Sequence, residues 1–179
     1  MPQTNSLSPV YDIRERARQN LDKGAVTYAS DESSDEATVQ MLNDALATEV
    51  VCALRYKRHY YMATGINARN VAQEFAEHAN EELEHADKLA SRIVQLGGAP
   101  DFSPKSLAIR AHSEYVEAIT LKEMLRENLV AERIAIQTYR EMIRVLGDDD
   151  PTTRRMIEDI LMVEEEHADE LASFLDLKD

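Results

Sequence analysis

Four long stretches of the chain repeat apolar residues at the three- and four-residue spacing of an amphipathic helix. Ser33 and Glu36 form a predicted capping box before the first stretch, and Gly65 interrupts it near residue 64. Asp149 or Asp150, followed by Pro151, is predicted to cap the last. The pattern therefore predicts helices over residues 33–64, 67–96, 119–146 and from 151 onward.

The connections between these helices predict the topology. The first and second helices are joined by a short turn, and so are the third and fourth, which makes each pair an antiparallel hairpin. Residues 97–118 form a long connection that must cross the bundle. We therefore expect an all-α, up-down four-helix bundle with one crossover over residues 37–179, preceded by an extension over residues 1–36 with a short helix from Pro9 to Gly24.

The core-facing positions of the four helices are apolar except at one level. This face also includes Tyr60 and Phe174, near the ends of the first and fourth helices. The first and third helices each place one glutamate on it, and the second and fourth each place the motif Glu-x-x-His. The six residues that interrupt the apolar faces are Glu49, Glu82, His85, Glu132, Glu164 and His167.

The two hairpins repeat each other in sequence. The phrase "EHADKLAS" at 84–91 returns as "EHADELAS" at 166–173, and "LNDALATEVVCALRY" matches "LRENLVAERIAIQTY". We therefore expect an approximate two-fold axis through the middle of the bundle.

Four glutamates at one depth of an apolar core need compensation, because an uncompensated buried charge is expensive. Two divalent cations would balance four carboxylates, and two neutral imidazoles would complete the coordination. Oxygen and imidazole ligands favour iron or manganese. The same arrangement, one Glu from each of two helices and Glu-x-x-His from the other two, is known from ferritin-like carboxylate proteins.

Composition and charge restrict the cellular location and the binding partners that we expect for the protein. The formal net charge is −14 without a segregated basic patch, so we expect neither strong DNA binding nor attraction to anionic membranes. The chain has one cysteine, no long apolar run and no signal-like N-terminus. These features predict a reducing, cytoplasmic location.

Over residues 42–176 the chain resembles the ferritin superfamily, and bacterioferritin most closely. The segments "EVVCALRY", "EELEHAD", "MLRENLVAE" and "ILMVEEEHAD" are similar to the motifs of its four helices. The resemblance implies that Glu49 and Glu132 are terminal ligands, that Glu82 and Glu164 bridge two irons, and that His85 and His167 each complete one iron. It also implies that Tyr56 lies beside the centre as a hydrogen-bond donor and electron source.

The resemblance implies a ferroxidase that oxidises Fe(II) with hydrogen peroxide or dioxygen, in a hollow homo-oligomeric shell that stores iron and protects against peroxide. Leu83 stands where bacterioferritin carries its haem-binding methionine, so we expect no haem. The chain lacks the fifth helix of 24-subunit cages, which favours the 12-subunit shell of Dps-like proteins, although it lacks their inter-subunit histidine motif and the cysteine pair that many carry. A di-manganese catalase-like enzyme or a di-iron oxygenase without iron storage is the alternative.

Several residues near the predicted centre keep more than one interpretation. Tyr139 is either a core aromatic or a symmetric counterpart of Tyr56. His78 could guide an ion toward Glu82, but we favour a satisfied, partly exposed histidine. Cys52 is interpreted as a small packing residue that could also lie near the metals. His59 and His112 have no informative sequence context.

Overall fold

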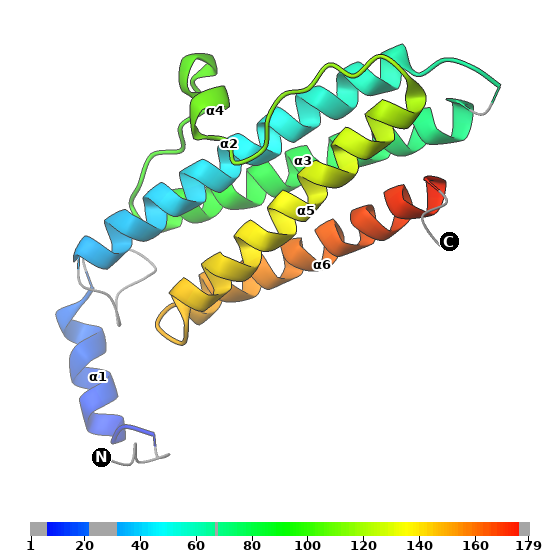
Figure 1. Ribbon diagram of the computed structural model, residues 1–179. Helices are drawn as coiled ribbons and strands as arrows, with labels where there is room; N and C mark the ends of the chain where they lie inside the picture. Colours follow the sequence, from blue (N-terminus) through cyan, green and yellow to red (C-terminus); the bar gives the residue numbers. More distant parts are fainter. Residues whose placement is uncertain (1–6, 22–31, 67, 176–179) are drawn as a thin grey trace.

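The structure is a computed structural model that describes residues 7–21, 32–66 and 68–175 (Figure 1). Within these ranges every regular element is a helix. The helices are α1 (Val10–Gln19), α2 (Glu32–Met62), α3 (Ala68–Gln95), α4 (Pro104–Arg110), α5 (Leu121–Leu146) and α6 (Pro151–Phe174). None of these helices combines the length and apolar character that a membrane span requires.

The four long helices form two antiparallel hairpins, α2–α3 and α5–α6, that pack side by side (Figure 1). The segment between α3 and α5, residues 96–120, runs back along α2 and is called the crossover below. The predicted all-α bundle with one long crossover is therefore confirmed.

The helix boundaries largely follow the predicted signals. Asp150 caps α6 by accepting a hydrogen bond from the Thr153 amide, and Pro151 is the first helical residue. The helix α2 begins at Glu32, so Ser33 lies inside its first turn and is not the capping residue. The predicted end of the first short helix at Gly24 lies outside the described residues, and α1, which runs to Gln19, has no buried residue. The division between an extension and a bundle at residue 36 stays a prediction.

The crossover contains structure that the sequence pattern did not predict. Its helix α4 is anchored by the buried side chain of Leu107. Thr120 and Glu123 form a reciprocal capping box at the start of α5. Both features are short and local, and the apolar periodicity of a long helix does not extend into them.

A buried arginine ties the crossover to the bundle. Arg55 on α2 donates from Nε to Asn128 Oδ1 on α5 at 2.9 Å, and from Nη1 to Ser113 Oγ at 2.9 Å and the Glu114 carbonyl at 2.8 Å. His59, one turn further along α2, lies 3.1 Å from the Val116 carbonyl, and burial together with Arg55 lowers its pKa to about 4. His59 is therefore a neutral imidazole that helps to hold the crossover against α2.

The apolar core lies on both sides of the polar level predicted from the sequence. One cluster includes Leu46, Leu89 and Ile160, and the other includes Phe75 and Leu171. The predicted inward orientation of Tyr60 and Phe174 is wrong, since each side chain is 38% exposed. Both residues lie in the last turn of their helix, where the neighbouring helices cover the side chain only in part.

Candidate metal centre

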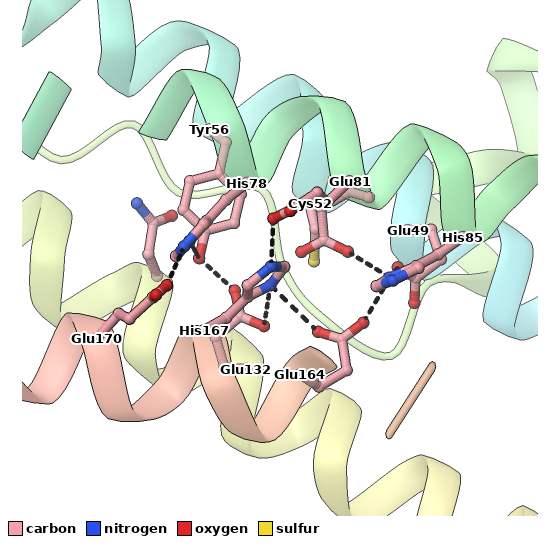
Figure 2. Close-up of polar contacts among 12 residues, drawn as sticks. Glu49, Cys52, Tyr56, His78, Glu81, His85, Glu132, Glu164, His167 and Glu170 are labelled. Atoms are coloured by element: carbon pink, nitrogen blue, oxygen red, sulfur yellow. Dashed lines mark hydrogen bonds and ion pairs between the residues drawn. The ribbon is translucent and has the colours of Figure 1, made fainter. Parts of the chain in front are cut away.

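The six residues that interrupt the apolar faces come together in the middle of the bundle, each at most 2% exposed. Figure 2 shows Glu49, His85, Glu132, Glu164 and His167. They form two overlapping groups in which one ligand atom from each residue lies within 4.8 Å of the others. One group contains Glu49 and His85, and the other contains Glu132 and His167. Glu82 and Glu164 belong to both groups. Two ions could therefore be held side by side by two shared carboxylates.

The oxygen and nitrogen atoms of this centre are poorly satisfied by the protein. Glu49 Oε2, Glu82 Oε1, both carboxylate oxygens of Glu164 and the Nδ1 atoms of both histidines make no hydrogen bond within the described residues. His85 Nδ1 lies 2.8 Å from Glu164 Oε1, but the angle does not suit a hydrogen bond. Buried polar atoms are rarely left without partners. The donor set fits bound cations better than it fits the protein alone.

The four carboxyl groups divide into two kinds. Burial raises the pKa of Glu82 and of Glu164 well above the usual value, and the neighbouring carboxylates add to the effect. Burial opposes ionisation of Glu132 too, but polar contacts with His167, Glu164 and Tyr56 and the charge of His167 outweigh it and lower its pKa to about 2. Polar contacts with Glu82, His85 and Tyr139 likewise lower the pKa of Glu49 despite burial. Without metal, the fold therefore favours the protonated form of the two shared carboxyls and the anionic form of the other two.

Two buried tyrosines contact the centre in a symmetric way. Tyr56 on α2 donates a hydrogen bond to Glu132 on α5, and Tyr139 on α5 donates one to Glu49 on α2. Burial raises the pKa of both phenols well above 10, so each stays a protonated donor. Tyr139 is thus the structural counterpart of Tyr56. The signal was available in the sequence, because each tyrosine follows a candidate glutamate by seven residues.

A second layer of side chains surrounds His167. Glu81 Oε2 lies 2.8 Å from His167 Nε2, which fixes the direction of the ring so that Nδ1 faces the centre. His78 stacks on His167 with ring centroids 3.9 Å apart, and its Nδ1 lies 3.2 Å from the Tyr56 hydroxyl. The predicted partial exposure of His78 is wrong: the residue is 1% exposed, because α2 and α6 cover it.

Cys52 lies buried on α2, and Arg55 Nη2 is 3.5 Å from its sulfur. Burial raises the pKa of the thiol to about 11. The thiol belongs to none of the ligand groups formed by the described residues, and it packs as a small neutral side chain.

The chain matches known proteins over the whole bundle. The family described as a ferritin-like domain matches residues 39–179. A bacterioferritin from Brucella melitensis is 31% identical over 142 residues, which cover 78% of this chain and 83% of the relative. A nutrient stress-induced DNA-binding protein from a Synechococcus strain is 30% identical over 139 residues, 75% of this chain and 78% of the relative.

Solved structures agree with this match. A bacterioferritin-related protein from Bacteroides fragilis, described as a dodecameric thioferritin, is 33% identical and superposes with a TM-score of 0.77, over 79% of this chain and 86% of its own. Dps from Thermosynechococcus elongatus, at 23% identity, has the same TM-score over 80% of this chain and 92% of its own. Because the identity to this Dps is low, the similarity shows a shared fold and nothing further.

Proposed function

Because the chain belongs to the ferritin-like family, whose members store iron or protect against peroxide, we propose that it is a ferroxidase. Its substrates are Fe(II) and hydrogen peroxide or dioxygen. The observation that carries the proposal is the pair of buried ligand groups that share Glu82 and Glu164. Such a pair holds two metal ions close together, with two carboxylates common to both.

Each of the six residues has a role in this proposal. Glu82 and Glu164 bridge the two Fe(II) ions, and because the pKa of both is raised, protons compete with the ions for these carboxylates. Glu49 and His85 complete one ion, and Glu132 and His167 complete the other. Manganese fits the same oxygen and imidazole donors.

Pairing the ions controls the outcome of peroxide reduction. Two Fe(II) ions each give one electron, so one hydrogen peroxide accepts two electrons and two protons, its O–O bond breaks, and two waters and two Fe(III) result. Transfer of one electron alone would release hydroxyl radical. Tyr56 holds Glu132 in place and is a phenol that can supply the second electron when only one Fe(II) is bound.

The product needs more anionic ligands than the substrate. Four glutamates balance the charge of two Fe(II) ions, whereas two Fe(III) ions exceed it and need further oxide or hydroxide ligands. Oxide and hydroxide are also the ligands of a ferric mineral, which a shell would enclose. We propose a 12-subunit shell, which the similarity to a dodecameric protein of 33% identity supports.

The test is a titration of the metal-free protein. Fe(II) is added anaerobically, then hydrogen peroxide, and the Fe(III) formed and the peroxide consumed are measured for each chain. We expect two Fe(II) oxidised for each peroxide, and slower consumption by the variant Glu82→Ala/His85→Ala. Equal rates in the two proteins would refute the proposal.

The same titration separates the alternative activities. A catalase-like di-manganese enzyme would consume peroxide without Fe(II), and an oxygenase would consume dioxygen with an organic substrate. Neither would show a fixed ratio of Fe(II) to peroxide.

A further inference from the structure

The two halves of the centre differ in their surroundings, although the hairpins that supply them are repeats. A shift of 82 residues relates Glu82 to Glu164 and His85 to His167. The same shift pairs polar residues near His167 with quite different residues near His85. The pairs are His78 with Ile160, Glu74 with Met156, Glu81 with Val163, and Glu170 with Lys88.

The polar residues near His167 form a ligand group of their own. His78 Nε2 lies 2.9 Å from Glu170 Oε2 and 3.6 Å from Glu74 Oε1. Glu74, His78 and Glu170, called the His78 cluster, each offer a ligand atom within 4.8 Å of the other two. The Glu170 side chain is 50% exposed and that of His78 only 2%. The cluster therefore reaches from solvent to the interior. Figure 2 shows Glu170 and His78 pointing toward each other.

The His78 cluster is connected to the centre by shared ligand atoms. His78 also forms a group with Glu132 and His167, whose atoms lie within 4.8 Å of one another. Glu132 and His167 in turn belong to one of the two central groups. An ion could thus move from Glu170 to Glu164 without leaving a set of oxygen and imidazole donors.

The opposite end of the centre offers no such path. Lys88 and Met156 line one surface groove there together with Glu84 and Asp87, neither of which belongs to a ligand group. Ile160 is fully buried in the apolar core. Among the described residues, no further ligand group lies on the His85 side. A lysine ammonium repels divalent cations, and apolar side chains offer them no ligands.

The donors of the His78 cluster suit a divalent cation. Two carboxylates and an imidazole at these distances are typical ligands for such an ion.

We propose that Glu74, His78 and Glu170 form a third divalent-cation site through which Fe(II) reaches the centre from the His167 side. The inference rests on the proposed function, because Fe(II) is the ion that would use this route. Binding itself can be tested with Zn(II), which does not undergo oxidation and accepts the same donors.

The binding test is diffraction from crystals of the whole protein loaded with Zn(II), with anomalous difference maps at the zinc edge. We expect a peak bounded by Glu74, His78 and Glu170 in addition to the central peaks. The peak should disappear in Glu74→Gln/Glu170→Gln. It should persist in Glu77→Gln/Glu166→Gln, which removes the same charge from exposed positions of α3 and α6. A native protein with no zinc at the His78 cluster would overturn the proposal.

The transport test measures the initial rate of Fe(II) oxidation against Fe(II) concentration. Glu74→Gln/Glu170→Gln should raise the apparent KM for Fe(II) about tenfold, the low end of electrostatic steering effects, with little change in the maximal rate. The control variant should behave as the native protein. An unchanged KM in Glu74→Gln/Glu170→Gln would overturn the route.

The two proposals fail in different ways. If the native protein oxidises Fe(II) with an unchanged KM in the cluster variant, the route is wrong and the ferroxidase stands. If zinc occupies the cluster but the native protein oxidises no Fe(II), the third site stands, and the ferroxidase and the route to it fall.

Discussion

The glutamates at the centre differ in the protonation that the metal-free fold imposes on them. Glu82 has a raised pKa, so the stability it contributes is present below its unfolded pKa, near 4.5, and is lost as the pH rises. The change Glu82→Gln keeps the shape and removes the ionisable group. We expect the metal-free variant to melt higher than the native protein at pH 8, by roughly 2–4 °C for each kcal/mol relieved, with a smaller gain at pH 5.

Glu132 provides the matched control for this measurement. Its pKa is lowered to about 2, so its contribution is present above pH 4.5 and is lost as the pH falls. Glu132→Gln should therefore lower the metal-free melting temperature at pH 7, with a loss of up to about 3 kcal/mol. Calorimetry of Glu82→Gln and Glu132→Gln, each with and without Zn(II), tests both expected shifts in melting temperature. A lower melting temperature for Glu82→Gln would contradict the assignment of its proton.

The two tyrosines predict a second effect at the residue scale. Tyr56→Phe removes the hydrogen bond to Glu132, and Tyr139→Phe removes the one to Glu49. Hydrogen bonds to a charged group contribute about 1.5–3 kcal/mol, so each variant should lose about that much metal-free stability at pH 7, where both carboxyls are ionised. Urea unfolding of the metal-free variants and of the native protein measures the loss. Unchanged stability in both variants would argue against this role.

The sequence was sufficient to find the six central residues, because each interrupts an otherwise apolar helical face. It was not sufficient for Glu81 and Glu170, and for His78 it left the guiding of an ion as the less favoured interpretation. Their contacts join α3 to α6 or α2, and the distances depend on how the helices are rotated against each other. The repeat itself contained a clue, since Lys88 and Glu170 are the one difference between the eight-residue segments 84–91 and 166–173.

At the scale of elements, two arginines of α2 hold the crossover by different means. Arg55 is 1% exposed and makes three hydrogen bonds to α5 and the crossover, whereas Arg58 pairs with the exposed Glu117 at 3.0 Å. Arg55→Lys loses the planar fork and leaves buried partners unsatisfied, so we expect about 2–4 kcal/mol of destabilisation. Arg58→Lys should cost less than about 1 kcal/mol. Urea unfolding of both variants measures the difference.

The helices that the sequence predicted well are those with long amphipathic patterns and clear ends. Gly147 adopts a φ of 53° after α5, and Asp150 caps α6, as expected of these residue types. The path of the crossover was not predictable in the same way. Arg55, His59 and Asn128 fix it through buried polar contacts, and such contacts leave no periodic trace in the sequence.

At the scale of the whole molecule, the mass of the assembly distinguishes the possible shells. Chains of 20.3 kDa give about 244 kDa for twelve copies and about 487 kDa for twenty-four. We expect the smaller value in native mass spectrometry. A mass near 487 kDa would contradict the shell that we propose.

Net charge predicts the behaviour of the assembly toward nucleic acid. One relative is named a DNA-binding protein, but each chain here carries a formal charge of −14. Phosphate backbones repel such a surface, so we expect no retardation of duplex DNA at 150 mM salt. Retardation that disappears with rising salt would reveal a basic region in the assembled protein.

The unequal surroundings of His85 and His167 have a consequence for any closed shell. Rotational symmetry gives every copy the same orientation relative to the inside and the outside. If ions enter each bundle only beside Glu170, the entry sites of all subunits face the same side of the shell. Fe(II) then reaches every centre from that one side. The side is set by Glu170, which stands where the other hairpin has Lys88.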